Sequence, residues 1–301
     1  MEEEEMHIGL IGLGKMGGNM RTRLRAGGIE VTGYDRNAEV SDAASVAEMV
    51  AALPAPRTVW VMVPAGKITD AVISELGDLL EPGDLVIDGG NSRFSDDFEH
   101  AKELGAKGID YVDAGVSGGV WGVENGYGLM VGGSAEQVAR VMPVFDALRP
   151  EGPREEGFVH VGEIGAGHYA KMVHNGIEYA MMQAFAEGFE LLEARKDLIK
   201  DVPGTFEAWQ RGTVVRSWLL DLLVLALKED PTLAEIEGYV EDSGEGRWTI
   251  EEAINNAVAV PTIAASIFAR FVSRQEDSPA MKAVAALRNQ FGGHSVVKSA
   301  E

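Results

Sequence analysis

The sequence predicts an α/β domain followed by a domain built only of helices. Short apolar segments alternate with helical segments from His7 to about residue 161, which is typical of a sheet covered by helices. A glycine-rich turn follows the first apolar segment directly. After Gly167 only helical periodicity remains. We therefore expect one domain over residues 1–163 and a second over residues 164–301.

Composition narrows the classes of protein to consider. The chain has 301 residues, 46% of them hydrophobic and 25% charged, which is enough for two folded domains. It contains no cysteine, which excludes disulfides and thiolate chemistry and leads us to expect a cytoplasmic location. A net charge of -22 disfavours nucleic acid and anionic membranes as partners. No apolar run reaches the length of a membrane span, and the start is acidic, unlike a secretory signal.

The first strand is expected over His7–Ile11 and leads into a glycine-rich turn and a helix. Gly12 allows the tight turn, Gly14 lets a pyrophosphate approach the backbone, and Gly17 permits close packing of the helix. The helix N-terminus offers unpaired N–H groups to the phosphates. This arrangement predicts a Rossmann-type dinucleotide-binding domain. The cofactor-binding residues expected here are Gly12, Leu13, Gly14, Met16 and Gly17.

The second strand, expected over residues 30–34, ends at Asp35. A carboxylate at this position binds the ribose 2'-hydroxyl of NAD and repels the additional phosphate of NADP. Arg36 follows immediately, and its guanidinium is able to accept a 2'-phosphate. A solvated turn residue is the alternative interpretation of Arg36, and we favour it. The sequence thus predicts a preference for NAD, with NADP as a second possibility.

The remaining elements of the first domain alternate regularly. Helices are expected over residues 45–53, 68–80, 94–104 and 135–148, and strands over 58–63, 85–88, 111–115, 128–131 and 158–161. This order predicts a parallel sheet, whose ligands bind beyond the carboxyl ends of the strands. We expect Val63 and Pro64 at the cofactor and Asn91 at both the cofactor and the substrate. The loop at Ser117, Gly118 and Gly119 exposes backbone N–H groups that suit a carboxylate or a phosphate.

Helices of the second domain are expected over residues 169–195, 205–228, 249–258 and 261–274. The first begins with Lys171, His174, Asn175 and Glu178 at helical spacing, so that these polar side chains share one face. Neighbouring apolar residues, including Ile177 and Met181, indicate that the face is buried. Buried charges need partners or a chemical role, and the pattern by itself fits either a structural ion pair or a catalytic pair.

At this point the motifs identify a family. The chain resembles the short-form 6-phosphogluconate dehydrogenases, which are decarboxylating, from His7 to His294. The resemblance rests on the glycine turn and three further motifs, with the run from Lys171 to Tyr179 the most specific. The three further motifs are Asp88-Gly89-Gly90-Asn91-Ser92, Val116-Ser117-Gly118-Gly119 and Arg288-Asn289-Gln290-Phe291-Gly292-Gly293-His294.

The resemblance implies roles for individual residues. Lys171 is expected to act as general base and Glu178 as general acid in a reaction that needs no metal. The sugar acid is expected to bind Asn91, Ser117, Gly118, Gly119, His174, Asn175 and Tyr179, and its phosphate Arg270. Arg288 and His294 are expected to reach into a neighbouring subunit's site, which implies a homodimer or homotetramer. The small-molecule partner is then a phosphorylated sugar acid.

Two departures from the longer members of the family stand out. Those members carry Lys-Gly-Thr-Gly-Lys-Trp where this chain has Gly244-Glu245-Gly246-Arg247-Trp248, so a phosphate-binding lysine is missing and Arg247 is a doubtful substitute. They also read Asn-Arg-Thr where this chain reads Asp35-Arg36-Asn37, which again points to NAD. Two alternatives stay open: a 3-hydroxyacid dehydrogenase of the related family that does not decarboxylate, and a catalytically silent NAD-binding protein.

Overall fold

A computed structural model describes residues 6–292 and 295–297 of the chain. The chain forms two compact units, Met1–His174 and Asn175–Glu301. The division falls inside a long helix, α8, that spans Ala166–Glu193. The domain boundary predicted between residues 163 and 164 lies just before this helix, and it stays a prediction.

The first unit is built on a sheet of seven strands in the order β2-β1-β3-β4-β5-β6-β7. The strands are β1 His7–Ile11, β2 Glu30–Tyr34, β3 Thr58–Val61, β4 Leu85–Asp88, β5 Asp110–Ser117, β6 Gly128–Gly132 and β7 Phe158–Gly162. All neighbours pair in parallel except β5 and β6, which are antiparallel. The predicted parallel sheet is therefore confirmed except at this one pair of strands. Only a short 3-10 turn and the small helix α5 (Gly122–Asn125) join β5 to β6, too little chain for a parallel crossover.

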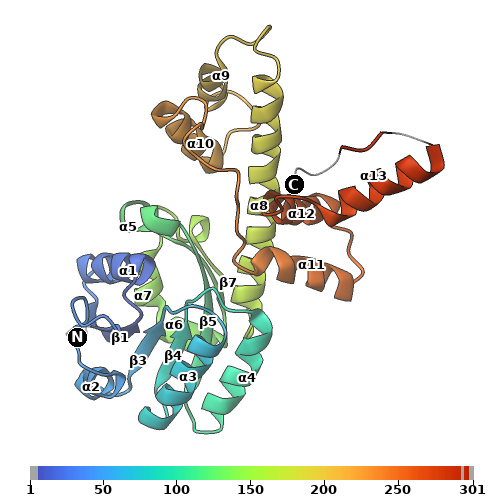
Figure 1. The fold of residues 1–301 in the computed structure, drawn as a ribbon. Coiled ribbons are helices and arrows are strands. Elements are labelled where there is room, and N and C mark those ends of the chain that lie inside the picture. Colours follow the sequence, from blue (N-terminus) through green and yellow to red (C-terminus); the bar gives the residue numbers. More distant parts are fainter. Residues whose placement is uncertain (1–5, 293–294, 298–301) are drawn as a thin grey trace. The chain divides into compact units, whose positions relative to one another are not determined.

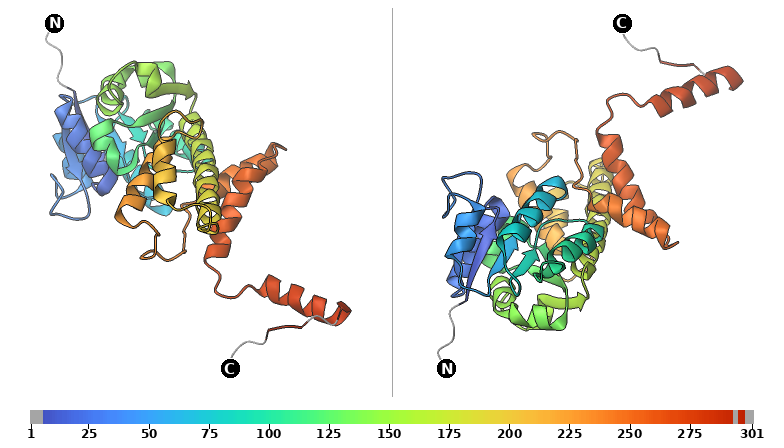
Figure 2. Two further views of the ribbon diagram at one scale, coloured as in Figure 1. Left: turned by 90° about the horizontal axis from the view of Figure 1, so that it is seen from above. Right: turned by 90° about the horizontal axis from the view of Figure 1, so that it is seen from below.

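Helices cover both faces of this sheet (Figure 1). One apolar layer packs beneath α1 (Lys15–Ala26), α6 (Ala135–Arg140) and α7 (Met142–Leu148). The other packs beneath α2 (Val46–Ala52), α3 (Lys67–Leu79) and α4 (Phe94–Gly105). Figure 2 shows the strands of this unit among their helices from two further directions. The predicted α/β Rossmann-type architecture is confirmed.

The helix predicted over residues 135–148 is two helices in the structure. Ser134 begins α6 with a capping box, in which its hydroxyl accepts from the Gln137 N–H and the Gln137 side chain accepts from the Ser134 N–H. The second helix, α7, starts at Met142 and carries Pro143 in its first turn. Proline lacks an N–H and fits the first turn of a new helix better than the interior of a continuing one.

The second unit contains helices and no strand among its described residues. Beyond the part of α8 that belongs to it, the helices are α9 Val202–Trp209, α10 Trp218–Glu229, α11 Glu245–Asn255, α12 Pro261–Ser273 and α13 Pro279–Gly292. Phe206, Leu220 and Val224 lie in a small apolar core that α9 and α10 share. Among the helices that the structure describes, none is both long and apolar enough to cross a membrane.

A single helix over residues 205–228 was predicted, and this was wrong. Residues 210–217 separate α9 from α10. Gly212 adopts a positive φ of 77°, which a continuing helix does not allow. Ser217 is extended, and its hydroxyl accepts a hydrogen bond from the Leu220 N–H, which starts α10 afresh.

Candidate active site

The glycine turn after β1 has the geometry that a dinucleotide-binding turn requires. Gly12 has a φ of 93°, and an added Cβ would lie 2.3 Å from the carbonyl oxygen of Met62. At Gly17 an added Cβ would lie 1.9 Å from the carbonyl oxygen of Gly12. At Gly14 a Cβ would meet no described atom beyond its chain neighbours within 4 Å. Gly12 and Gly17 thus shape the turn, while Gly14 leaves the helix N-terminus open to a phosphate.

Asp35 is tied directly to this turn. Its Oδ2 accepts a hydrogen bond from the backbone N–H of Leu13 at 2.7 Å, and its Oδ1 accepts from the N–H of Asn37 at 2.9 Å. The hydrogen bond from Asn37 and that from Leu13 lower the pKa of Asp35 against the opposing effect of burial. The carboxylate therefore stays ionised at neutral pH, while Arg36 beside it is exposed.

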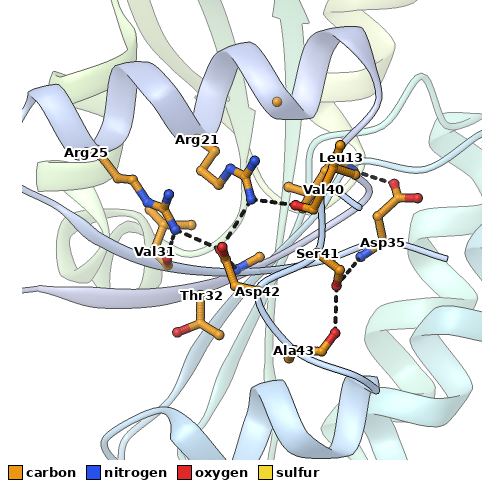
Figure 3. Close-up of polar contacts among 12 residues, drawn as sticks. Leu13, Arg21, Arg25, Val31, Thr32, Asp35, Val40, Ser41, Asp42 and Ala43 are labelled. Atoms are coloured by element: carbon orange, nitrogen blue, oxygen red, sulfur yellow. Dashed lines mark hydrogen bonds and ion pairs between the residues drawn. The ribbon is translucent and has the colours of Figure 1, made fainter. Parts of the chain in front are cut away.

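A second carboxylate, Asp42, holds the loop that follows β2 (Figure 3). Its Oδ2 accepts from Arg25 at 2.7 Å, from Arg21 at 3.3 Å and from the N–H of Gly33 at 2.9 Å. Both arginines come from α1, the helix that the glycine turn starts. The sequence did not predict this contact of Arg21 and Arg25 with Asp42. It shows that the two arginines share one face of a helix, but it does not show which carboxylate they meet.

The loops after β3 and β4 lie at neighbouring strand ends, as predicted, since these strands pair in parallel. Val63 is half-buried, and Pro64 and Asn91 are exposed. Asp88 shapes the second loop from inside: its Oδ1 accepts from the Gly90 N–H at 2.9 Å and its Oδ2 from the Ser92 hydroxyl at 2.7 Å. Asn91 therefore projects from a loop whose two flanking residues are fixed.

The end of β5 lies against the start of α8. An added Cβ at Gly115 would lie 2.4 Å from the Cβ of Lys171, so helix and strand are closely packed there. Further along, the Ser117 hydroxyl lies 3.3 Å from Nε2 of His174. Gly118 and Gly119 follow with φ values of 141° and 54°, conformations that favour glycine. The structure thus brings His174 to Ser117 in the predicted loop, and Lys171 to Gly115, two residues before it.

The polar face of α8 is largely buried, as predicted. Lys171 and Asn175 are each 8% exposed, Tyr179 is buried, and His174 and Glu178 are half-buried. Two of the apolar neighbours behave differently: Ile177 is 51% exposed and Met181 is 37% exposed. The expectation that these two side chains lie in the interior was wrong, because the helix turns their positions toward solvent.

Within the second unit, Tyr179 and Arg270 come together. The guanidinium of Arg270, on α12, lies 3.5 Å from the centre of the Tyr179 ring, and its Nη1 donates to the carbonyl oxygen of Glu241 at 2.9 Å. The Tyr179 hydroxyl lies 3.2 Å from the hydroxyl of Ser243. A guanidinium stacked on a ring keeps its planar edge available for an anion.

Two family models match the chain. The NAD binding domain of 6-phosphogluconate dehydrogenase matches residues 7–151, and the C-terminal domain of 6-phosphogluconate dehydrogenase matches residues 167–299. The chain belongs to the 6-phosphogluconate dehydrogenase family. This confirms the family that the sequence motifs predicted, and with it an oxidoreductase with an NAD-binding domain.

Relatives of the family match over nearly the whole chain. A Haloferax volcanii protein named NAD(+)-dependent, decarboxylating 6-phosphogluconate dehydrogenase is 42% identical over 304 residues, covering 97% of this chain and 99% of its own length. A solved Plasmodium falciparum 6-phosphogluconate dehydrogenase, described with NADP+ and with 6-phosphogluconate, has a TM-score of 0.81 at 27% identity. That match covers 97% of this chain, which spans 66% of the longer Plasmodium chain.

A solved 3-hydroxyisobutyrate dehydrogenase of Mycobacterium tuberculosis has a TM-score of 0.70 at 23% identity, covering 94% of this chain and 99% of its own. At that identity the likeness concerns the fold alone. It therefore adds nothing for or against a reaction without decarboxylation.

The structure describes two of the three further residues that the sequence associated with the substrate: Arg247 and Arg288, but not His294. Arg247 donates two hydrogen bonds to Asp242, at 2.7 and 2.9 Å, and this ion pair disfavours it as a substitute for the missing lysine. Arg288 is exposed on α13. His294 lies outside the described residues.

Two overlapping groups of buried side chains bring their oxygen and nitrogen atoms within 4.8 Å of one another: Asp88, Asp97 and His100, and Asp97, Asp113 and His168. Tyr111, Ser92 and His168 already make hydrogen bonds to these carboxylates. We therefore treat both groups as internal networks and assign no metal site to them.

Proposed function

We propose that the protein oxidises and decarboxylates 6-phospho-D-gluconate to ribulose 5-phosphate and carbon dioxide, with reduction of NAD. The observation that carries the proposal is the polar face of α8, where a buried Lys171 packs against β5 and Glu178 follows at helical spacing on the same helix. The family and the name of the Haloferax relative support the same reaction. The Plasmodium structure, described with 6-phosphogluconate, supports the substrate.

Lys171 begins the reaction in its neutral form. It accepts the proton of the C3 hydroxyl as a hydride leaves C3, which gives a 3-keto acid. NAD, which the glycine turn and Asp35 would hold, would supply the acceptor for that hydride. Protonated Lys171 then donates a hydrogen bond to the C3 oxygen, so that this oxygen takes up the electrons released when carbon dioxide leaves. Glu178 donates a proton to C1 of the resulting enediol. Each transfer by a positioned side chain contributes roughly 10²- to 10⁴-fold to the rate.

The other predicted residues hold the substrate in this proposal. The N–H groups of Gly118 and Gly119 suit the carboxylate, with Ser117, His174 and Asn175 at the hydroxyls and Asn91 next to the nicotinamide and the reacting carbon. The stacked pair of Arg270 and Tyr179 suits the phosphate, because a guanidinium binds phosphate oxygens in a bidentate manner. A protein with a net charge of -22 needs such a local cation to attract a polyanionic sugar acid.

The proposed cofactor is NAD in preference to NADP. The ionised Asp35 at the end of β2 suits a ribose hydroxyl and repels a 2'-phosphate. Use of NADP at lower efficiency remains part of the proposal, since Arg36 is exposed beside Asp35.

We also propose that Arg288 and His294 complete the site of a neighbouring subunit in a homodimer or homotetramer. The exposed position of Arg288 on α13 supports this role. Mixed oligomers of an Arg288→Ala chain and a Lys171→Ala chain should regain activity that neither has alone. Verified mixed oligomers without any recovery would contradict a shared site. A cytoplasmic location also remains a prediction.

The deciding experiment incubates the protein with 6-phosphogluconate and NAD, and separately with NADP, and follows reduced cofactor and carbon dioxide together. Equal amounts of both products support the proposal. Reduced cofactor without carbon dioxide would instead identify a 3-hydroxyacid dehydrogenase, and tight NAD binding without turnover a silent protein.

The Lys171→Met variant should lose about 10²- to 10⁴-fold in kcat while remaining folded. Lys102→Met is the matched control, because Lys102 is exposed on α4 and pairs only with Glu99 in the described structure. Normal turnover by Lys171→Met would refute the assignment of the base.

A further inference from the structure

At the carboxyl ends of strands β4 and β5, the first unit buries several charged groups. Asp88, Asp97 and Asp113 are fully buried, and His168 is 2% exposed. Tyr111 lies among them, with its hydroxyl 2.8 Å from Asp97 and 3.4 Å from Asp88. The reaction proposed above uses none of these side chains. Apolar residues of similar size would fill the same space at a lower desolvation cost, so their presence calls for an explanation other than stability.

The first part of the explanation is the start of α8. Asp113, on β5, accepts a hydrogen bond from the Gly165 N–H at 2.7 Å with one oxygen and from the His168 N–H at 2.9 Å with the other. It thereby caps the helix that carries Lys171 one turn further on. Gly115, two residues along the same strand, makes the close contact with Lys171. The strand therefore holds the helix at two successive points on one face.

The second part is the buried ion pair of His168 with Asp97. Nδ1 of His168 lies 2.9 Å from both carboxylate oxygens of Asp97, which stands in the first turn of α4. Burial by itself lowers the pKa of His168, but the charge of Asp97 and the hydrogen bond to it raise that pKa to about 10. Burial raises the pKa of Asp97 to about 6. The pair is therefore charged around neutral pH.

The third part of the explanation is a connection from this ion pair to the loop at residues 88–92, which carries Asn91. The Tyr111 hydroxyl donates to Asp97 and lies within hydrogen-bonding distance of Asp88. Asp88 in turn accepts from Ser92 and from the Gly90 N–H, the residues on either side of Asn91. A continuous chain of buried hydrogen bonds and one longer polar contact, that of Tyr111 with Asp88, thus runs from the first turn of α8 to the loop at residues 88–92.

We propose that Asp97, Tyr111 and His168 are positioning residues, which hold the first turn of α8, and therefore Lys171, at a set distance from the loop that carries Asn91. Shifts of about 1 Å in a catalytic group cost roughly a hundredfold in rate, so fixing this distance matters for the reaction. The kinetic consequence rests on the proposed function. The geometric claim concerns this chain with or without turnover.

The test compares the full-length protein with Asp97→Asn and Tyr111→Phe. Both variants keep the size of the side chain, and Tyr111→Phe removes only the hydroxyl. Asp84→Asn is the matched control, because Asp84, just before β4, is also a buried carboxylate but bonds to Arg57 instead of to the network. Hydrogen exchange of the backbone amides over residues 165–174 measures how firmly the first turns of α8 are fixed. The kinetic constants kcat and KM measure the effect on the reaction.

We expect faster exchange over residues 165–174 in Asp97→Asn and Tyr111→Phe, and a loss in kcat of about ten- to a hundredfold with KM nearly unchanged. Asp84→Asn should leave both readouts at their native values. Unchanged exchange over residues 165–174 would overturn the proposal, and so would an equal effect of Asp84→Asn. A lowered unfolding temperature with native kcat would also overturn it, since this outcome marks a purely structural role.

Failure of the proposed function gives a different result from failure of this network. If the native protein releases no carbon dioxide from 6-phosphogluconate, the proposed function fails. The exchange comparison then still decides the network, because it needs no substrate.

Discussion

Replacement of Gly115 by alanine tests the contact on which the placement of Lys171 depends. The added methyl group would lie 2.4 Å from the Cβ of Lys171 and 2.8 Å from the carbonyl oxygen of Gly167. Neither atom is the end of a flexible side chain, since one is backbone and the other is the first side-chain carbon. The helix itself must therefore move away from β5.

The size of the displacement follows from ordinary contact distances. Carbon atoms in contact lie about 3.5–4.0 Å apart, so α8 has to shift by roughly 1 Å. Forcing a methyl group into a packed site costs about 1–3 kcal/mol, which lowers the unfolding temperature of a unit of this size by several degrees. A shift of about 1 Å at a catalytic group reduces kcat roughly a hundredfold.

The assay measures the initial rate of NAD reduction at saturating 6-phosphogluconate, together with thermal unfolding. Gly128→Ala is the control, because a Cβ at Gly128, on the neighbouring strand β6, would have its nearest contact at 3.9 Å. The control should match the native protein in both measurements. If Gly115→Ala kept native kcat and stability, the close contact of strand and helix would have no role in placing Lys171, and the reasoning would fail.

Two further predictions concern ionised side chains. Asp35→Ser should lower kcat/KM for NAD about tenfold and narrow the preference over NADP, because a charged hydrogen bond to the ribose is lost; steady-state kinetics with both cofactors check this, and an unchanged ratio would contradict it. The pKa of His168 rises from 6.5 to about 10 on folding, so its contribution to the free energy of unfolding is complete below pH 6.5 and is lost as the pH rises through 10. Asp97, with a pKa of about 6, is ionised throughout most of that window. Urea unfolding should therefore show that the free energy of unfolding of the native protein falls between pH 6.5 and 10, and that it falls less steeply in His168→Gln. Equal dependence on pH in the two proteins would refute this role of His168.

Much of the fold could be predicted because the signals are local. An apolar strand, a glycine turn and a helix that follow one another leave a pattern within twenty residues or so, as at Gly12 and Asp35. The polar face of α8 was visible in the same way, since helical spacing alone aligns Lys171 with Asn175 and Glu178. Family membership followed from the same short motifs, and the family models confirm it.

Other features could not be predicted because they depend on breaks in a pattern. Residues 205–228 keep a helical periodicity, but Gly212 and the cap at Ser217 interrupt the helix. Helical periodicity records which residues share a face and says little about where one helix stops. Likewise, the composition of β6 does not reveal its direction. β6 runs antiparallel to β5 because the connection between the two strands is too short for a parallel crossover.

The sequence by itself determined the order of the elements, the dinucleotide-binding turn, the carboxylate at Asp35 and the shared face of Lys171 and Glu178. Only the tertiary structure decided that Gly115 touches Lys171, that Arg270 stacks on Tyr179, and that Asp97 meets His168. Those last two residues are 71 positions apart. No periodic pattern records such a meeting, because the path of the chain through the sheet and helices sets which distant side chains become neighbours.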